Sequence, residues 1–314
     1  MRVITIHKHI FDESDIEKLS SYGIDITFCQ ENELLLKIES DEIAYLIGGI
    51  ELNKLSFCEL PHIRVIQLIT SGYEYIDVKS LKDANIKLTN ATDIYSIPIS
   101  EWVVSQILIY YKNAYYFYNN HKQSVWLSDY RLNELHSKSI LVFGTGSIGK
   151  EIVRRLDAFG CVVDGVNTTG KIVESFRRCY SLSESVEVIG DYEILIFCLP
   201  STEKTKYFLN IETLRQISRE SLVINVGRGD LINEEDLMKF LDEENTIHFI
   251  LDVAQNEPLP SDHPFWSSKN LFISPHNSFA SINNKKRLRQ LVIENVLRFI
   301  SKKKLVNEVD LDDE

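Results

Sequence analysis

The sequence lacks the features that mark membrane, secreted and nucleic-acid-binding proteins. Its longest apolar run, residues 97–111, is interrupted by Glu101 and Gln106, so it is too short and too polar to span a bilayer. Residues 1–15 carry charges within their apolar run, which argues against a signal peptide. The net charge of -12 disfavours binding to a phosphate backbone or to an anionic membrane surface. These absences favour a cytoplasmic protein.

Cysteine is scarce as well. The chain has five cysteines, an odd number, and no two of them form a CxxC pair. Cys161 and Cys198 lie inside apolar runs, which is typical of free, buried thiols in a reducing compartment rather than of a disulfide framework. His7 and His9 stand close together, but no cysteine or carboxylate pattern accompanies them, so no metal site is expected.

The second half of the chain has a regular alternation of apolar runs and helical stretches. At 314 residues the chain is too long for one typical core, so two domains are expected. Near-continuous apolar strands that alternate with helices predict a parallel sheet covered on both faces. The strands are expected at residues 139–144, 161–166, 193–200, 221–227, 249–254 and 271–275.

Helices are predicted from apolar stripes at helical spacing. The helix after Gly149 presents Ile152, Val153, Leu156 and Phe159. Further helices are expected at residues 97–119, 233–244 with Asn233 as N-cap, and 285–300. The first hundred residues show a looser version of the alternation, with strands expected at residues 2–6, 24–28, 34–38, 64–69 and 86–90.

Gly144, Gly146 and Gly149 form a G-x-G-x-x-G pattern between a predicted strand and a predicted helix. The first glycine permits a tight turn, the second lets the backbone approach a pyrophosphate, and the third lets helix and strand pack closely. The helix N-terminus would then offer free N–H groups to the phosphates. A glycine-rich turn without a ligand is the alternative, but strand and helix provide the context that a dinucleotide site requires.

The residue that meets the adenosine ribose is expected about 20 residues further on, which points to Asn167. Asp or Glu at this position would accept the ribose hydroxyls and repel a 2′-phosphate, whereas Asn167 hydrogen-bonds without that repulsion. Thr168, Thr169 and Lys171 could contact such a phosphate, and Asp164 is an alternative acidic candidate inside the strand. NAD and NADP therefore both stay open, with a slight preference for NADP.

Three residues of unlike chemistry follow three of the predicted strands. Arg228 lies in a glycine-flanked turn, Glu257 in a loop, and His276 directly after the sixth strand. Ligands of open parallel sheets bind outside the carboxyl ends of the strands, so all three belong to the edge that carries the glycine loop. Individually they could be a surface arginine, a polar loop residue and a structural histidine. Together they predict acid/base chemistry beside a dinucleotide.

The order of the glycine loop, "NVGRGDLINEEDL", "LDVAQNEPLPSDHPFW" and "LFISPH" resembles the D-isomer-specific 2-hydroxyacid dehydrogenase family, from about residue 60 to about 306. The resemblance implies that Arg228 binds the substrate carboxylate and ketone, that His276 is the acid/base, and that Glu257 supports His276. It also implies substrate contacts from the backbone around Ser71, Gly72 and Tyr73. The implied cofactor-binding residues are Gly144, Gly146, Ser147, Ile148, Gly149, Asn167, Leu199, Pro200, Thr205, Val226, Gly227 and Asp252, the last of them holding the nicotinamide carboxamide.

The chemistry agrees with these roles. Reduction of a 2-keto acid delivers hydride to a carbonyl carbon and needs a proton for the oxygen, and imidazolium is a good donor near neutral pH. A neighbouring carboxylate favours that charged form. A guanidinium can grip a carboxylate as a planar fork. A phosphoglycerate substrate would need further cations in the first domain, for which His62 and Arg64 are the candidates.

The sequence as a whole predicts an α/β protein of two doubly wound parallel-sheet domains. Residues 1–100 with 284–314 are expected to form a flavodoxin-like substrate-binding domain, and residues 101–283 an inserted Rossmann domain that binds the dinucleotide. The predicted function is an oxidoreductase that transfers hydride between NAD or NADP and a small 2-keto or D-2-hydroxy acid. A dinucleotide-sensing interaction protein of corepressor type is the alternative. The resemblance also implies a homodimer, formed with the aromatic-rich helix after Glu101.

Overall fold

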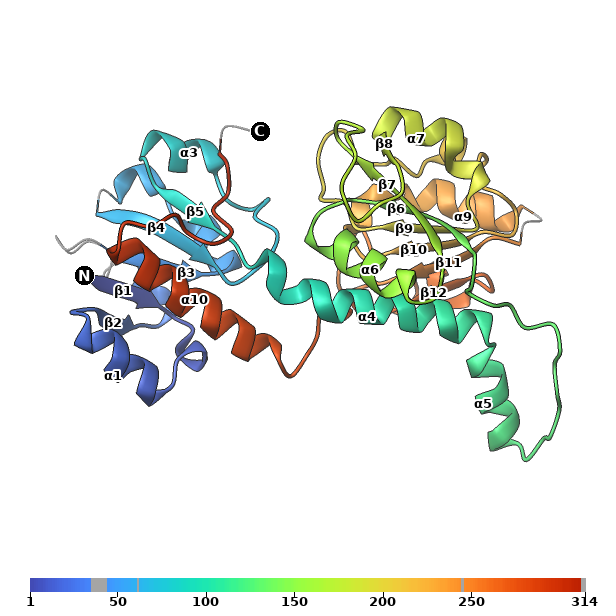
Figure 1. Ribbon diagram of the computed structural model, residues 1–314, viewed down its shortest axis with the longest axis horizontal. Helices are drawn as coiled ribbons and strands as arrows, with labels where there is room; N and C mark the ends of the chain where they lie inside the picture. Colours follow the sequence, from blue (N-terminus) through green and yellow to red (C-terminus); the bar gives the residue numbers. More distant parts are fainter. Residues whose placement is uncertain (35–43, 61, 244–245, 312–314) are drawn as a thin grey trace. The chain divides into compact units, whose positions relative to one another are not determined.

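The computed structural model describes residues 1–34, 44–60, 62–243 and 246–311. The chain folds into two compact units, Met1–Tyr95 with Ser281–Glu314, and Ser96–Ala280. Most of the strand expected at 34–38, the end of the helix expected at 233–244 and residues 312–314 lie outside the described residues. Figure 1 shows the elements of each unit.

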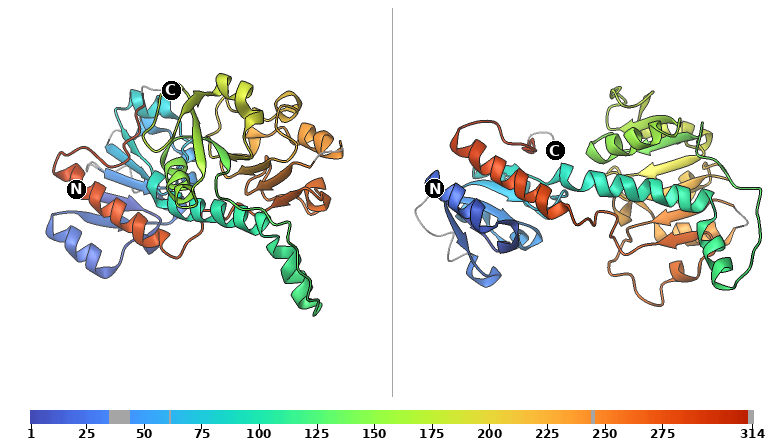
Figure 2. Two further views of the ribbon diagram at one scale, coloured as in Figure 1. Left: turned by 45° about the vertical axis from the view of Figure 1, so that its right-hand side comes forward. Right: turned by 60° about the horizontal axis from the view of Figure 1, so that its bottom comes forward.

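The first unit is built on a parallel sheet of order β2-β1-β3-β4-β5. Alternate residues of its strands face opposite sides, as the pleat dictates. Val3, Tyr45 and Val65 pack under α1 and α10, whereas Ile4, Leu46 and Ile66 pack on the side of α3. Figures 1 and 2 show α10, from the end of the chain, beside the strands from its beginning. The strands are β1 (Arg2–Thr5), β2 (Asp25–Phe28), β3 (Ala44–Gly48), β4 (Ile63–Leu68) and β5 (Lys87–Thr89), and the helices are α1 (Glu13–Ser21), α3 (Val78–Asp83) and α10 (Asn284–Ile300).

The second unit contains a seven-stranded parallel sheet of order β12-β11-β10-β9-β6-β7-β8. When β6 is counted as strand 1 and the sheet is read from β8, the order is the 3-2-1-4-5-6 of a Rossmann fold, with β12 as one further strand. The six expected strands are present, and the prediction of an α/β fold with parallel sheets is confirmed. The strands are β6 (Ser139–Phe143), β7 (Val162–Asn167), β8 (Cys179–Ser181), β9 (Ile194–Phe197), β10 (Leu222–Asn225), β11 (His248–Leu251) and β12 (Leu271–Ile273).

Helices cover both faces of this sheet (Figure 1). Asn233 caps α9 as expected, because its side chain accepts a hydrogen bond from the amide of Asp236. Phe159 does not belong to the apolar stripe of α6, since the helix ends at Asp157 and Phe159 is 37% exposed. The helices are α4 (Thr92–Tyr111), α5 (Ala114–Lys122), α6 (Ser147–Asp157), α7 (Leu182–Val188), α8 (Ile211–Leu214) and α9 (Glu234–Asp242), and the 3₁₀ turns of the two units are η1 (Lys8–Ile10), η2 (Glu31–Glu33), η3 (Ile50–Lys54), η4 (Phe57–Glu59), η5 (Ile189–Asp191), η6 (Gly229–Leu231) and η7 (Pro264–Ser267).

The prediction of a single helix at 97–119 is wrong, because this segment forms two helices, α4 and α5. Asn113 has φ +51, a left-handed conformation that no helix can continue through and that asparagine tolerates better than most residues. The segment from α5 to Asn133 then projects from the rest of the second unit as an arm, seen in Figures 1 and 2. Lys112 closes its base by donating to the carbonyl of Asn133.

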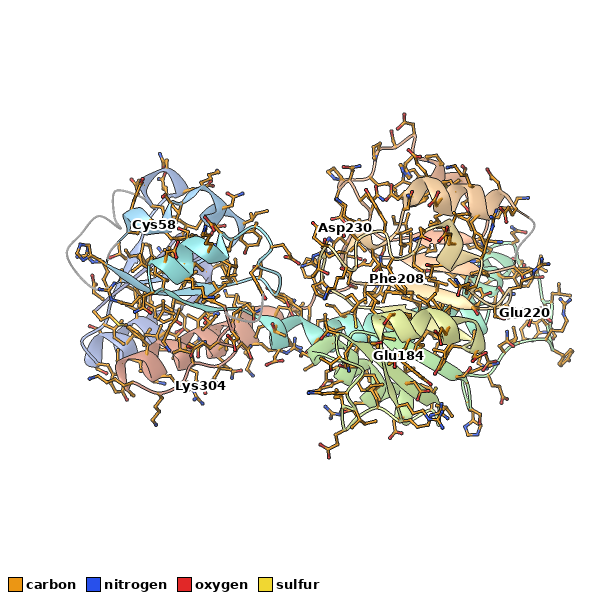
Figure 3. The ribbon with its side chains drawn as sticks, turned by 90° about the horizontal axis from the view of Figure 1, so that it is seen from above. Cys58, Glu184, Phe208, Glu220, Asp230 and Lys304 are labelled. Atoms are coloured by element: carbon orange, nitrogen blue, oxygen red, sulfur yellow. The ribbon has the colours of Figure 1, made fainter. Side chains whose placement is uncertain are left out.

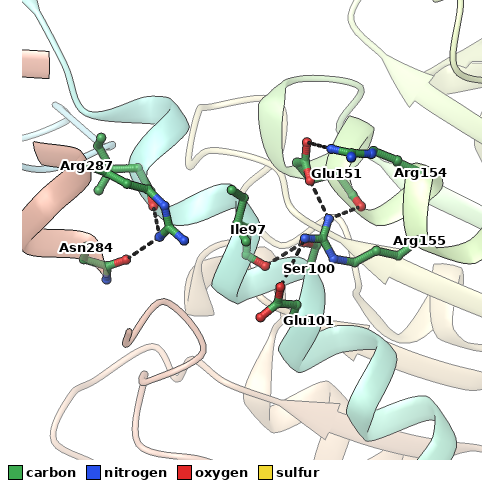
Figure 4. A network of polar contacts seen from close by, with 9 residues as sticks. Ile97, Ser100, Glu101, Glu151, Arg154, Arg155, Asn284 and Arg287 are labelled. Carbon is green, nitrogen blue, oxygen red and sulfur yellow. Dashed lines mark hydrogen bonds and ion pairs between the residues drawn. The ribbon is translucent and has the colours of Figure 1, made fainter. Parts of the chain in front are cut away.

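Helix α4 is tied to α6, the helix that follows the glycine loop. The guanidinium of Arg155 on α6 lies 3.3 Å from the carboxylate of Glu101 on α4, and it also bonds Glu151 one turn back on its own helix (Figure 4). The guanidinium of Arg155 is therefore shared by two carboxylates, and it links α6 to α4.

The five cysteines are all free thiols. Cys58 is exposed, and the other four, including Cys161 and Cys198, are partly buried, so the expectation of free thiols is confirmed and that of burial is met only in part. Among the described residues, no helix is long and apolar enough to cross a membrane.

Candidate active site

The carboxyl ends of the parallel strands of the second unit share one edge, so the loops that follow them are neighbours. The glycine loop follows β6, Asn167 ends β7, and Leu199 and Pro200 come after β9. The turns with Arg228, Asp252 and His276 come after β10, β11 and β12. This topology brings the predicted dinucleotide site and the predicted catalytic residues to the same edge.

The glycine loop has the geometry that a dinucleotide needs. Gly144 has φ +110, and a side chain there would also strike Cys198, since a Cβ would lie 2.9 Å from its Sγ. A Cβ on Gly149 would lie 2.0 Å from the carbonyl oxygen of Gly144, so only glycine lets α6 pack against the loop. A Cβ on Gly146 would meet nothing within 4 Å. Gly146 precedes the first turn of α6, which leaves open space beside the free N–H groups.

The end of β7 carries no free carboxylate. The side chain of Asn167 donates to Thr145 Oγ1 of the glycine loop and to the carbonyl of Lys171, and it accepts from the amide of Thr169. The loop from Asn167 to Lys171 is thereby tied to the phosphate cradle. Thr168, Thr169 and Lys171 are exposed there.

Asp164, the alternative ribose-binding candidate, is fully buried inside β7 and does not belong to this edge. Its carboxylate accepts two hydrogen bonds from Arg177, of 2.9 and 2.6 Å, and one of 2.6 Å from the hydroxyl of Tyr192. Burial opposes the charge of this carboxylate, but the bonds from Arg177 and Tyr192 outweigh that effect and hold its pKa below the usual range. Asp164 is thus part of a core ion pair.

The loops after β9 and β10 support each other. Thr205 is buried and its hydroxyl donates to the carbonyl of Pro200. A Cβ on Gly227 would lie 2.6 Å from the carbonyl oxygen of Leu199, so the two loops touch backbone to backbone. Ser201 adds a hydrogen bond of 2.5 Å to the carboxylate of Asp230, the residue labelled in Figure 3. Leu199 and Gly227 are therefore in contact, and both follow strands at the carboxyl edge of the sheet, as Pro200 and Val226 do.

Arg228 lies between β10 and η6, in an extended conformation. The side chain of Asn225 fixes this turn by accepting from the amide of Gly227 and donating to the carbonyl of Arg228. The next residue, Gly229, packs against the backbone of Ala254, where a Cβ would lie only 2.0 Å away. The turn that carries Arg228 is therefore in contact with the loop that leads to Glu257.

His276 and Glu257 form a close pair. The imidazole Nδ1 lies 2.7 Å from Glu257 Oε2, and the other carboxylate oxygen accepts from the amide of Ala254 at 3.1 Å. The ring of Phe279 meets the imidazole edge-on, with centroids 5.8 Å apart. Because a carboxylate only accepts, Nδ1 carries the proton of this bond, and Nε2 is the ring nitrogen left for a ligand.

Asp252 is 1% exposed, and the segment after β12 surrounds its carboxylate. One oxygen accepts from the hydroxyl of Ser274 at 2.5 Å and from the amide of Asn277 at 3.0 Å, and the other accepts from the amide of Ser278 at 2.9 Å. These contacts could not be predicted from the sequence, because the partners come from a segment more than twenty residues away.

In the first unit, the predicted substrate loop follows the carboxyl end of β4. The side chain of Asn90 donates to the carbonyl of Ser71, and the hydroxyl of Thr70 bonds the carbonyl of Gly72 and lies 2.6 Å from the hydroxyl of Tyr75. These bonds fix the backbone around Ser71, Gly72 and Tyr73.

The two candidate phosphate-binding cations lie at the other end of this strand. His62 precedes β4 and Arg64 is its second residue, so both belong to the amino end of the sheet. The length of the strand, about 20 Å, separates that end from the substrate loop.

Among the described residues, no group of three or more His, Cys, Asp or Glu side chains could hold a metal ion. The site contains the glycine loop before α6 and the hydrogen-bonded pair of His276 and Glu257.

Three comparisons with known proteins agree with this geometry. The sequence model of the D-isomer specific 2-hydroxyacid dehydrogenase NAD binding domain matches residues 104–278, more than half of the chain. A glyoxylate/hydroxypyruvate reductase from Arabidopsis thaliana is 27% identical over 273 residues, which cover 86% of this chain and 83% of that protein. A hydroxypyruvate reductase from Blautia hydrogenotrophica is 24% identical over 318 residues, covering 96% of this chain and 97% of the relative.

Among solved structures, a D-isomer specific 2-hydroxyacid dehydrogenase family protein from Aeromonas salmonicida superposes with a TM-score of 0.80 at 26% identity, over 99% of both chains. The names of these relatives lend no support to the corepressor-type alternative. The chain belongs to the D-isomer specific 2-hydroxyacid dehydrogenase family, which confirms the predicted oxidoreductase that uses NAD or NADP with a 2-hydroxy or 2-keto acid.

Proposed function

We propose that the chain reduces a small 2-keto acid, or oxidises the corresponding D-2-hydroxy acid, with His276 as the group that exchanges a proton with the substrate oxygen. The observation that carries this proposal is the 2.7 Å contact between His276 Nδ1 and the carboxylate of Glu257. Since that contact occupies Nδ1, a proton reaches the substrate from Nε2. Glu257 fixes the tautomer and the direction of the imidazole that protonates the oxygen.

Arg228 is proposed to hold the substrate. A guanidinium binds a carboxylate as a planar fork and stabilises negative charge on a neighbouring oxygen, which is what a 2-keto acid presents during reduction. Its turn is held by Asn225 and packs on Ala254, so the fork starts from an ordered backbone next to the loop of Glu257.

The second unit is proposed to bind the dinucleotide and the first unit the substrate. The dinucleotide site is proposed from the open space at Gly146, the first turn of α6 and the loops after β9 and β10. When bound, the nicotinamide supplies or accepts the hydride. We also propose a preference for NADP, because Asn167 has no negative charge to repel a 2′-phosphate, and Thr168, Thr169 and Lys171 are exposed beside it.

The proposed substrates are small, uncharged at the end away from the carboxylate, and of the glyoxylate or hydroxypyruvate type. Two curated relatives carry those substrates in their names. A phosphorylated substrate is disfavoured because His62 and Arg64 lie at the amino end of β4, away from Ser71.

A substrate panel tests the proposal. The purified chain is mixed with NADPH or NADH and with glyoxylate, hydroxypyruvate, pyruvate and 3-phosphohydroxypyruvate, and the near-ultraviolet absorbance of the reduced nicotinamide is followed. We expect the fastest oxidation with NADPH and one of the first two acids. No turnover with any 2-keto acid would contradict the proposal, and a preference for the phosphorylated acid would contradict its substrate class.

A homodimer is proposed from the arm of the second unit. The arm carries apolar side chains that solvent reaches freely, among them Trp126 at 97% and Tyr130 at 95% exposure. A patch of this kind on a projecting segment is typical of an interaction site. Light scattering should give the mass of a dimer, and W126S/Y130S should give a monomer. The control is I282S, which removes an equally exposed apolar residue of the first unit. A monomeric wild type would refute this proposal.

A cytoplasmic location is proposed as well, on the ground that all five cysteines are free. Cell fractionation with detection of the native chain tests it, and recovery of the chain outside the cytoplasm would contradict it.

A further inference from the structure

We propose that Asp252 is a positioning residue that acts through His276, in addition to any contact it makes with a cofactor. This inference rests on the proposed role of His276 as the proton-exchanging group. The observation behind it is that the buried carboxylate of Asp252 gathers three hydrogen bonds from a single segment, residues 274–278, at whose centre His276 lies.

The backbone of His276 needs such support. Its φ is +49, in the left-handed region that residues other than glycine seldom adopt. A conformation of this kind costs on the order of 1 kcal/mol and persists only where its surroundings enforce it. Here the amide of His276 donates to the backbone carbonyl of Asp252 at 2.8 Å. Ser274 and Asn277, on either side of His276, both donate to the carboxylate of Asp252.

The direction of the imidazole follows from this turn. A left-handed residue sends its side chain in a different direction from an extended one, so relaxation of the turn would move Nδ1 away from Glu257. The 2.7 Å contact therefore depends on two carboxylates: Glu257, which bonds the ring, and Asp252, which fixes the backbone from which the ring projects.

The carboxylate is matched to its partners, and an amide would not be. Its Oδ1 accepts from Ser274 and Asn277 and its Oδ2 from Ser278, so all three partners are donors. In D252N one acceptor oxygen becomes an NH₂ group, and at least one of the three donors is then left facing another donor in a buried place.

The experiment compares D252N, S274A and S274T in the full chain. Each variant is assayed for kcat and KM with the best 2-keto acid at saturating reduced cofactor, and for the dissociation constant of the cofactor by fluorescence titration. D242N serves as the control, because Asp242 is an exposed carboxylate at the end of α9. Thermal unfolding verifies that each variant is folded.

We expect kcat to fall about a hundredfold in D252N, as a misplaced catalytic group would cause, while KM for the keto acid changes less because Arg228 is untouched. S274A should lower kcat roughly three- to tenfold with an unchanged cofactor dissociation constant, since the short hydrogen bond of the Ser274 hydroxyl goes to the carboxylate of Asp252. S274T keeps the hydroxyl and should restore activity.

A double-mutant cycle separates this role from a cofactor contact. If Asp252 acts through the pair of His276 and Glu257, D252N/E257Q should be little slower than the slower single variant. If the kcat losses of the two single variants multiplied in the double variant, the inference would be overturned. So would a D252N variant whose only defect is weaker cofactor binding, together with a silent S274A. Near-wild-type turnover of H276N would instead remove the proposed function, whatever Asp252 does.

Discussion

His276 Nδ1 lies 2.7 Å from Glu257 Oε2, although the two residues are 19 positions apart and follow different strands. The imidazole is 40% exposed and the carboxylate 36%, so the pair is accessible to a substrate and is also ordered by its own hydrogen bond. Because Glu257 holds Nδ1, the proposed proton transfer to a keto oxygen uses Nε2.

The first prediction concerns that contact. In E257Q an amide replaces the carboxylate that holds Nδ1, while the shape of the side chain is kept. The imidazole then loses the partner that fixes its tautomer and direction, so kcat for keto-acid reduction should fall roughly tenfold or more. Initial rates at saturating substrate test this. A kcat equal to that of the wild type would show that Glu257 does not influence the proton carrier.

A second prediction separates catalysis from binding. H276N removes the proton carrier, and we expect kcat to fall by about a hundredfold or more with little change in the dissociation constant of the cofactor. H263N is the matched control. His263 lies in the same unit, and its Nε2 is 3.4 Å from a carboxylate of Glu234, yet no role in the reaction is proposed for it. Equal losses in both variants would refute the assignment of His276.

Periodicity was enough to predict six strands of the second unit because each is a near-continuous apolar run. It missed β8, whose three residues Cys179–Ser181 are only partly buried and give no apolar signal. It also missed β3, Ala44–Gly48, even though all five residues are buried. The left-handed Asn113 that ends α4 was not foreseen, since the aromatic run continues across it.

The candidate site was predictable to the extent that its residues follow strands. Parallel strands place their ends at one edge, which is why Arg228, Glu257 and His276 could be grouped from the sequence. The contacts of Asp252 and the burial of Asp164 could not be derived in this way. They depend on which distant side chains fill the space around each carboxylate, and strand order does not determine that.

The third prediction concerns the choice of cofactor. N167D places a carboxylate at the end of β7, where it would accept ribose hydroxyls and repel a 2′-phosphate. The ratio of kcat/KM for NADPH to that for NADH should fall by about tenfold or more. N167S removes the amide without adding charge, and it should change the ratio less. If both variants shift the ratio equally, the charge at this position does not select the cofactor.

The last prediction concerns stability. Asp164 is fully buried, and its bonds with Arg177 and Tyr192 outweigh the cost of burial and keep its pKa below the usual range. A carboxylate with a lowered folded-state pKa stabilises the fold above its unfolded-state pKa of about 4, and this contribution is lost as the pH falls through the lower, folded-state value.

R177M should therefore reduce the free energy of unfolding near pH 7. The loss should be about 1–2 kcal/mol, less than for a fully buried pair because the guanidinium is 53% exposed. Urea unfolding at several pH values would measure the difference between R177M and the wild type, which should shrink as the pH falls below about 4. R219M, at an exposed position of the same unit, is the control and should change stability by less than about 0.5 kcal/mol. A difference between R177M and wild type that stays constant down to acid pH would mean that Arg177 stabilises the fold by packing rather than through the charge of Asp164.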